Sequence, residues 1–594
     1  MVRVLQWLVL AAVSMMACNA LLGIEERPAR PPTASGGAGV GGAGGTSTGC
    51  VPDDCAGTCV DGLCCETPCE GTCEACNLSS SEGSCTPYPA ATDPEGECPE
   101  STCDGAGHCV GCDWRRARAF GDGIETQYPR DVAVNSSDAV IVTGRFKGSM
   151  AFGSTTLQSA GDSHHAFVAQ LDDLGEALWS HQWGNELHLA EIDHLGKSIA
   201  VDSADNVLII GRYLAWDGTG ISPGEGGTGG AGGAGGAGGA PTKDFTIGEQ
   251  ALPPFYPQHG IFLTKLNEEG KPLWSHGFGS KTGEQSGQDV AVDSQDNVII
   301  TGQHIEASIL SSVGLKLQAI PDVFSGFVAK LDPDGNGTWS FSFGFDMAGY
   351  HQRPHAVAID SRDDVLIAGQ YRGLVAFGDH VLPNFGPADA IFIAKLTETL
   401  DEPHCSWARG WGNSTATQYV AEVALDSEDN VVLAAGIRGP VDFGSGELFG
   451  VPDYYSVLVA KLDSDGKTIW SQAFGEPDQH QYVTALAIDS ADNILVSGYF
   501  AGTLALDSGS LQAITLAQYD AFTVKLAPNG KVLCARQAGN GEWDTYSSAI
   551  AVGSDDSFII TGRFRDVLDF GFGEQLSGVN DGTGFDMFLA RYGR

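Results

Sequence analysis

The sequence predicts an all-β protein: a seven-bladed β-propeller of four-stranded antiparallel blades, preceded by a small disulfide-rich module. The first observation is a repeated stretch, best seen at Asp289–Gly302, which reads DVAVDSQDNVIITG. Its seven copies close on glycines spaced 62–67 residues apart, with one interval of 91: Gly144, Gly211, Gly302, Gly369, Gly436, Gly498 and Gly562. The second observation is that each unit reads as four short strands without a helix. Four strands in about 65 residues are the content of one propeller blade.

Each unit contributes its strands in a fixed order. The first two are the I-A-V-D and N-V-I-I-T-G runs, joined by an Asp/Asn-rich turn such as Asp293–Asn297. Asn and Asp tolerate the positive φ that such a turn needs. The third strand is the FVAKLD run, as at Phe327–Asp332, and a glycine turn leads to a fourth strand that carries a tryptophan, as at Trp339. Strands separated by short turns indicate antiparallel hairpins.

An alanine occupies the same position of the first strand in all seven units: Ala133, Ala200, Ala291, Ala358, Ala424, Ala487 and Ala551. Where blades converge on a central axis the space between sheets narrows, and a small side chain fits that taper. The repeated alanine therefore predicts that the first strand is the innermost strand of each blade.

The two ends of the array predict a closed ring. The seventh unit ends with its third strand, Met587–Tyr592, and Arg115–Gly121 reads as a fourth strand with no unit of its own. If the N-terminal segment completes the last blade, no sheet edge is left unpaired.

Four segments are expected along the chain. Residues 1–18 resemble a lipoprotein signal peptide, in which Arg3 precedes an apolar run and Cys18 ends a lipobox-like Met-Met-Ala-Cys sequence. That resemblance implies acylation of Cys18 and a membrane anchor; the alternative is a plain secretory signal. Residues 19–49 are a Gly/Pro-rich tether, 50–112 a Cys-rich module and 113–594 the propeller, with a Gly-rich insert at 218–240.

The Cys-rich segment holds 13 of the 16 cysteines. Their density in an exported chain predicts disulfides, with zinc as the alternative because C-x-x-C pairs occur. The odd count leaves one thiol over, and Cys405 and Cys534 lie far away in two different repeats.

Charge and motifs limit the function. Lys plus Arg number 32 against 75 Asp plus Glu, a net charge of −43, which excludes nucleic acid as an expected partner. G-x-S-x-G, H-E-x-x-H and the phosphate-binding G-x-x-x-x-G-K-S/T are absent. We expect no cofactor. Asp332–Gly337 imitates the start of a calcium loop but is better explained as a hairpin turn.

The candidate ligand-binding residues lie in the loops that lead into the first strands, at one mouth of the central channel. Four tyrosines each fall five residues before the repeated alanine: Tyr128, Tyr419, Tyr482 and Tyr546. They form either a structural ring or a stacking surface for a ligand. Histidines also fall in or next to these loops, among them His194, His351, His355 and His480. A metal or acid–base site is one interpretation of the histidines, and surface histidines are the other.

The repeats resemble the bacterial seven-bladed β-propeller (SBBP) repeat family, whose pattern joins A-V-D-x-x-x-N-V-x-x-T-G to F-x-x-K-L-D-x-x-G. Unit one departs at Asn135 and unit seven at Gly553. The resemblance implies a fold and cell-surface occurrence, and no reaction.

We expect a non-enzymatic lipoprotein, anchored at the outer membrane or cell surface, whose loops bind a protein or carbohydrate ligand. Three alternatives stay open. One is a quinoprotein-like dehydrogenase, because Lys461–Ser471 is similar to the docking repeat of those enzymes. Another is a lyase or glycosidase at the channel mouth, and the third is a purely structural envelope protein.

Overall fold

The computed structural model describes residue 112 and residues 114–593, except for gaps at 160–162, 186–192, 216–244, 256, 308, 319–322, 346–349, 400–401, 451–452, 477–478, 508, 572–574 and 580–583. Ahead of these it describes four strands, β1 (Thr58–Val60), β2 (Leu63–Cys65), β3 (Glu74–Ala75) and β4 (Thr86–Pro87). The predicted signal peptide with Cys18, the tether, the insert and most of the Cys-rich segment lie outside the described residues. Within the described chain, no helix is long and apolar enough to cross a membrane.

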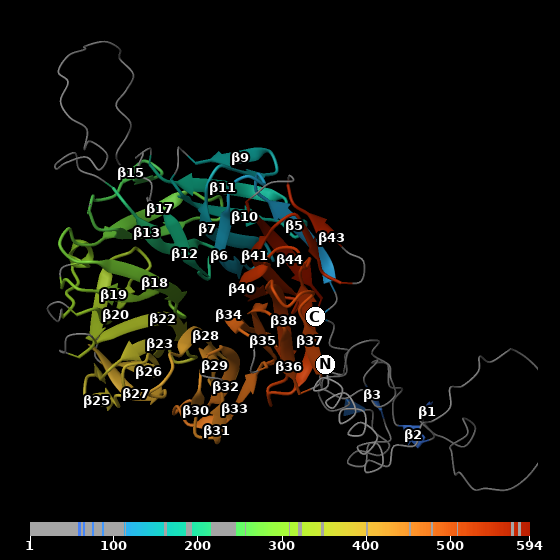
Figure 1. Cartoon of the computed structure of the whole chain (residues 1–594). Coiled ribbons are helices and arrows are strands. Elements are labelled where there is room, and N and C mark those ends of the chain that lie inside the picture. The colour runs from blue at the N-terminus through green and yellow to red at the C-terminus, as the bar shows by residue number, and fades with distance from the viewer. Residues whose placement is uncertain are drawn as a thin grey trace, which may run out of the picture. The chain divides into compact units, whose positions relative to one another are not determined.

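Seven four-stranded antiparallel sheets are arranged as the blades of a propeller (Figure 1), as the sequence predicts. From the channel outward, blade one contains β6 (Gln127–Val134), β7 (Val140–Phe146), β10 (His165–Leu171) and β11 (Ala177–Trp183), and blade two contains β12 (Leu195–Val201), β13 (Val207–Tyr213), β16 (Gly260–Leu266) and β17 (Pro272–Phe278). In the same order, blade three contains β18 (Gln285–Val292), β19 (Val298–His304), β20 (Ser325–Leu331) and β21 (Gly337–Phe343); blade four β22 (His351–Ile359), β23 (Val365–Arg372), β26 (Ala390–Thr399) and β27 (Glu402–Trp411); and blade five β28 (Tyr419–Leu425), β29 (Val431–Ile437), β32 (Ser456–Leu462) and β33 (Thr468–Phe474). Blade six contains β34 (Gln481–Ile488), β35 (Ile494–Phe500), β38 (Asp520–Leu526) and β39 (Val532–Ala538), and blade seven contains β40 (Tyr546–Val552), β41 (Phe558–Phe564), β44 (Asp586–Tyr592) and β5 (Trp114–Phe120).

The N-terminal strand closes the ring. β5 pairs antiparallel with β44, so that Phe120 lies opposite Met587 and Trp114 opposite Tyr592. In Figure 1 this strand, coloured blue, lies among the red strands of the last blade. The prediction of a fourth strand at Arg115–Gly121 is confirmed.

Short hairpins between the second and third strands were not predicted: β8 (Ser149–Phe152) with β9 (Thr155–Gln158), β14 (Thr246–Ile247) with β15 (Gln250–Ala251), β24 (Val375–Phe377) with β25 (His380–Leu382), β30 (Pro440–Asp442) with β31 (Glu447–Phe449), β36 (Thr503–Leu506) with β37 (Gly509–Gln512), and β42 (Val567–Asp569) with β43 (Gln575–Ser577). Blade three has the 3₁₀ turn η2 (Ser311–Val313) at this place instead. These strands are only two to four residues long. In five of the six hairpins a buried apolar residue stands directly before a glycine of the turn: Phe152, Ile247, Phe377, Phe443 and Phe570.

The hydrophobic core is divided among the interfaces between blades. Seven clusters of buried residues each combine side chains of two neighbouring blades, and the cluster between blades seven and one includes Ile559 and Val142. Each repeated alanine packs against one of these clusters; Ala133 of blade one, for example, packs beside Ile199 of blade two. The predicted place of the alanine near the axis is therefore confirmed.

A ring of polar contacts links the turns between the first and second strands. In each turn a serine hydroxyl donates a 2.6–2.8 Å hydrogen bond to an aspartate of the next blade. The pairs are Ser136–Asp205, Ser203–Asp296, Ser294–Asp363, Ser361–Asp429, Ser427–Asp492, Ser490–Asp556 and Ser554–Asp138. These aspartates have φ of 58–64°, which confirms the positive φ expected for the turn.

A buried ion pair explains another part of the repeat. In blades two to six the lysine of the F-V-A-K-L-D strand contacts the first aspartate of the turn, as Lys265 contacts Asp202 at 2.8 Å. Blade one has Asn135 in place of this aspartate and Gln170 in place of the lysine. Blade seven has Gly553 and Arg591, and the Arg591 Nε instead donates to the Ser557 hydroxyl at 3.1 Å. The units that depart from the repeat therefore change both partners together.

A disulfide joins Cys112 to Cys534 on β39, with Cα atoms 6.2 Å apart. Both sulfurs belong to the cluster between blades six and seven. The sequence left the partner of the leftover thiol open; Cys534 lies far away in sequence, and β5 brings Cys112 to it by returning the chain to the last blades. Cys405 is a free thiol.

Candidate functional site

Every innermost strand contains a β-bulge at the same place. The register with the second strand slips by one residue, and the extra residue lies three positions before the repeated alanine. The seven extra residues are Arg130, Lys197, Gln288, His355, Ala421, Thr484 and Ser548. A bulge re-aims side chains and strengthens the local twist. It also explains the closing glycine, because a Cβ on Gly144 would lie 2.1 Å from the carbonyl oxygen of Tyr128.

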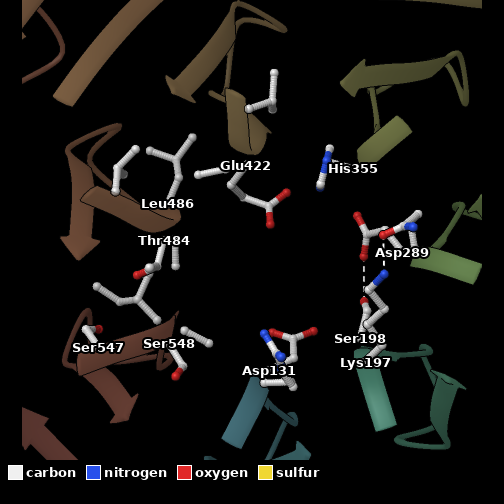
Figure 2. A pocket seen from close by; sticks show the side chains of 18 of the residues that line it. Asp131, Lys197, Ser198, Asp289, His355, Glu422, Thr484, Leu486, Ser547 and Ser548 are labelled. Atoms are coloured by element: carbon white, nitrogen blue, oxygen red, sulfur yellow. Dashed lines mark hydrogen bonds between the residues drawn. The ribbon is translucent and has the colours of Figure 1, made fainter. Parts of the chain in front are cut away.

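The bulges surround a cavity of about 540 Å³ in the central channel (Figure 2). All seven bulge residues line it, together with side chains that follow them in the strand, above all Asp131, Ser198, Asp289 and Glu422. The lining is predominantly polar and carries both signs of charge. Such a group of convergent polar side chains in a cavity of this size is the default binding-site hypothesis.

Two of the carboxylates also connect neighbouring blades. Asp131 accepts hydrogen bonds from the N–H of Val132 at 2.8 Å and from the N–H of Ile199, in blade two, at 2.7 Å. Asp289 makes the equivalent bonds to Val290 and, in blade four, to Val357. Burial raises the pKa of Asp131 to about 7 despite these bonds, and it also raises the pKa of Asp289.

Glu422 and His355 are less constrained and both point into the cavity (Figure 2). Glu422 accepts one hydrogen bond, from the N–H of Val423 at 3.1 Å, and burial raises its pKa well above the usual value. The His355 ring lies 3.2 Å from the amide oxygen of Gln370, and burial lowers its pKa to about 4. At neutral pH the His355 imidazole is therefore neutral, and burial shifts the Glu422 carboxyl group toward its protonated form.

Lys197 extends from blade two toward blade three. Its ammonium group donates to the side-chain oxygen of Gln288 and, at 3.3 Å, to the carbonyl of Gly287. Burial, followed by the charges of Arg130 and Arg212, lowers the pKa of Lys197 to about 7.

An arc of aromatic rings covers one side of the channel mouth. The ring centroid of Tyr455 lies 5.1 Å from that of Tyr419 and 5.4 Å from that of Tyr482. The ring centroid of Tyr499 lies 4.9 Å from that of Tyr482 and 4.8 Å from that of Tyr546. The arc continues to Tyr519 and Phe585, and the His480 ring stacks on Tyr482 at 5.1 Å. We call these residues of blades five to seven the aromatic arc: Tyr419, Tyr455, Tyr482, Tyr499, Tyr519, Tyr546 and Phe585.

The predicted tyrosines lie at this mouth. Tyr419 and Tyr546 line the cavity, and Tyr482 lies in the middle of the arc. Tyr128 stands apart from the arc on blade one, where the guanidinium groups of Arg145 and Arg563 each lie 4.5 Å from its ring centroid. Three of the four predicted tyrosines, Tyr419, Tyr482 and Tyr546, therefore belong to an arc over blades five to seven, and the four do not form a complete ring.

The predicted histidines separate into different environments. His355 lines the cavity and His480 belongs with the aromatic arc. His351 contacts Asp389 at 3.1 Å. His194 is fully buried, contacts Asn185 at 3.3 Å and has a pKa lowered to about 3 by burial. It takes the position that a buried glutamine, such as Gln127, holds in five other blades.

No metal cluster is evident in the part of the chain that the structure describes: no three or more His, Cys, Asp or Glu side chains are placed to hold an ion together. The calcium-like turn is a hairpin turn, in which Asp332 accepts hydrogen bonds from the N–H groups of Asp334 and Asn336 at 3.1 and 2.8 Å.

Sequence reasoning missed the residues on the inner strands, namely Arg130, Asp131, Lys197, Asp289 and Glu422. The signal was available, because each lies two or three positions before the repeated alanine, where the chain varies between units. The sequence-based prediction placed the candidate residues in the loops and not on the inner strands.

Fold and site together define a seven-bladed propeller with a polar cavity in its channel and an aromatic arc at one mouth. No protein-family model matches the chain. An uncharacterized WD repeat-containing protein of Acanthamoeba polyphaga mimivirus is 25% identical over 222 residues, which are 34% of this chain and 16% of that protein. The chain thus matches only a small part of that relative's length.

Solved structures share the architecture at low identity. A polysaccharide lyase, an ulvan lyase, aligns over 80% of this chain and 97% of its own with 9% identity and a TM-score of 0.36. A protein of unknown function from Dyadobacter fermentans aligns over 81% and 99% with 10% identity and a TM-score of 0.32. A virginiamycin B lyase from Staphylococcus aureus aligns over 67% and 98% with 7% identity and a TM-score of 0.28. We draw no functional argument from these similarities.

Proposed function

We propose that this propeller is a binding module for saccharides, which dock at the channel mouth against the aromatic arc and extend polar groups into the cavity. The observation that supports it best is the continuous series of seven aromatic rings across blades five to seven. Tyrosine combines an apolar face with a hydroxyl group, which suits a ligand that has both C–H faces and hydroxyl groups.

The cavity beneath the arc supports the same proposal. Tyr419, Tyr499 and Tyr546 belong to both the arc and the cavity wall. Gln288, Thr484 and Ser548 line the cavity, and the carboxyl group of Glu422 points into it. A sugar that stacks on the tyrosines would therefore find donors and acceptors below it.

The test is a binding measurement on the purified chain with a panel of envelope and plant oligosaccharides. We expect Tyr482→Ala to weaken binding at least tenfold, because a stacking ring is lost, whereas Tyr482→Phe, which keeps the ring, retains most of the affinity. Equal affinity for the wild type and Tyr482→Ala would contradict the proposal. Absence of binding to every oligosaccharide would favour a protein partner or a purely structural envelope role.

A second candidate function is acid–base catalysis in the cavity, because neutral His355 and the carboxyl group of Glu422 face the same space. A base and an acid in one enclosed site are what a lyase or glycosidase requires. Chain cleavage of bound polysaccharide, lost in both His355→Ala and Glu422→Gln, would establish it. Binding without cleavage would leave the non-enzymatic module.

We further propose that the chain is exported and held at the outer membrane or cell surface by acylated Cys18, as the resemblance to SBBP-repeat lipoproteins implies. The buried Cys112–Cys534 disulfide supports export, since disulfides form in oxidising compartments. Cys18→Ala should release the protein from membranes; a variant that still fractionates with them and carries acyl chains would contradict the anchor.

A further inference from the structure

Arginines from three blades gather on the side of the channel mouth that the aromatic arc leaves open. Arg130 is the bulge residue of blade one, and the other three follow the closing glycines of blades one, two and seven: Arg145, Arg212 and Arg563. We call these four residues the arginine cluster. Lys197 lies below them in the cavity wall. In a chain with a net charge of −43, such a group of cations requires a specific explanation.

The anions within the protein do not satisfy this cluster. Arg145 and Arg212 share the single carboxylate of Asp193. Among the described residues, neither Arg130 nor Arg563 has an ion pair or a hydrogen bond from its guanidinium group. Two guanidinium groups, each with its N–H donors in a fixed fork, are thus left without an acceptor among the described residues.

Arg563 is held in place without an anion. Its guanidinium carbon lies 4.5 Å from the ring centroid of Tyr128 and 4.3 Å from that of Tyr546, so the group lies between two aromatic rings. Aromatic faces orient a cation while leaving its N–H groups free at the edge. Since Tyr546 is also a member of the aromatic arc, the cluster and the arc meet at this residue.

Arg130 lines the cavity among like charges and is exposed to the solvent of the channel. Desolvation by the surrounding protein, followed by the charges of Arg145 and Arg563, lowers the pKa of Arg130. Like charges held together in a partly enclosed space repel one another, and a bound anion would remove that cost. A guanidinium group prefers carboxylate, sulfate or phosphate, which it binds with two parallel hydrogen bonds.

We propose that the arginine cluster binds the acidic group of the ligand, so that the preferred ligand is an acidic saccharide with a carboxylate or sulfate substituent at Arg130 and Arg563 and a sugar ring on the aromatic arc. This inference rests on the proposed saccharide-binding function and specifies its ligand class. The uncharged part of the ligand contacts blades five to seven, and its charge lies over blades one, two and seven.

The experiment compares tetragalacturonate with its fully methyl-esterified form, which keeps the sugar rings and removes the charge. Binding is measured by calorimetry on the full chain. We expect the acid to bind at least tenfold more tightly than the ester, with a preference that falls at high salt. Arg130→Gln should abolish the preference. Arg362→Gln, an exposed arginine in the turn between β22 and β23 and outside the cluster, is the matched control and should keep it.

Melting temperatures in sodium sulfate test the arginine cluster without a sugar. At equal ionic strength with sodium chloride, sulfate should raise the melting temperature of the wild type and of Arg362→Gln more than that of Arg130→Gln. Equal binding of acid and ester, with no Arg130-dependent sulfate effect, would overturn the inference and leave saccharide binding intact. A sulfate effect without binding of either saccharide would keep the arginine site and overturn the saccharide. Failure of all arms would overturn both proposals.

Discussion

The hydroxyl of Ser554 in blade seven donates a 2.6 Å hydrogen bond to the carboxylate of Asp138 in blade one, and its backbone N–H donates a second at 2.8 Å. The same pair of contacts joins blade one to blade two through Ser136 and Asp205. The junction between the last and the first unit is therefore made in the same way as every junction within the chain. What distinguishes it is that blade seven takes its outer strand from the other end of the sequence.

Ring closure predicts the effect of removing residues 113–121. Without β5, β44 becomes an exposed edge strand and loses its backbone hydrogen bonds, so the melting temperature should fall by many degrees. A chain that begins at Cys112 and keeps β5 is the control. Thermal unfolding followed by circular dichroism makes the comparison, and equal melting temperatures would show that β5 is not needed.

The disulfide predicts a large difference between two cysteine substitutions. Cys112→Ala should lower the free energy of unfolding by about 2–5 kcal/mol, because the bond closes a loop of 422 residues. Cys405→Ser removes a free thiol on the edge strand β27 and should cost less. Urea denaturation under non-reducing conditions measures both. A Cys112→Ala protein as stable as the wild type would mean that the bond contributes nothing to the folded state.

The buried ion pairs predict that single and double substitutions differ. Lys265→Met leaves Asp202 buried without its partner and should cost about 3–5 kcal/mol. The double variant Asp202→Asn with Lys265→Gln copies blade one, where Asn135 accepts the same turn hydrogen bonds from Ser137 and Ala139, and should cost less. Urea denaturation at pH 7 distinguishes them; a single variant that is as stable as the double variant would contradict the pairing.

The ion pair between Lys265 and Asp202 also makes the stability of the protein depend on pH in the acid range. Burial raises the pKa of Asp202, but hydrogen bonds from Lys265 and Asn206 outweigh it and the net pKa is lowered. A lowered pKa contributes stability above the unfolded value of about 4, and this contribution is lost as the pH falls through the folded pKa. Between pH 5 and pH 2 the wild type should therefore lose more stability than the double variant.

Glu422 predicts a dependence of the opposite sign. Its folded pKa is raised, so its contribution is fully present below the unfolded value of about 4.3 and is lost as the pH rises toward the folded pKa. As the pH rises from 5 to 8, the melting temperature of the wild type should therefore fall relative to that of Glu422→Gln. Glu428→Gln, on the exposed turn of the same blade, is the control and should follow the wild type.

The fold was predictable because its determinants repeat. The alanine, the closing glycine and the Asp-rich turn each occupy a place that ring geometry restricts, so all seven units carry the same residue or a close substitute. Trp114–Phe120 could be recognised because the last unit lacked one strand. The outer hairpins were harder to recognise because their strands have only two to four residues, although a buried residue before a turn glycine, as in Phe377-Gly378, recurs in five of the six.

The site was less predictable because binding residues are the positions that the fold does not restrict. Arg130, Lys197 and His355 hold the same structural position, yet no residue type repeats among them. Their common place before the repeated alanine is visible in the sequence, but the register slip that makes their side chains converge on the channel is not. His194 failed to reach the cavity for the opposite reason, since it replaces a buried structural glutamine.

The Cys112–Cys534 bond also determines how the propeller withstands a pull on the chain ahead of it. Tension applied from the N-terminal side reaches Cys112 before it reaches β5 and passes through a covalent bond into blade six. The hydrogen bonds between β5 and β44 are thus shielded from being opened one after another. With the proposed anchor and ligand in place, the propeller would in this way transmit force without opening its ring.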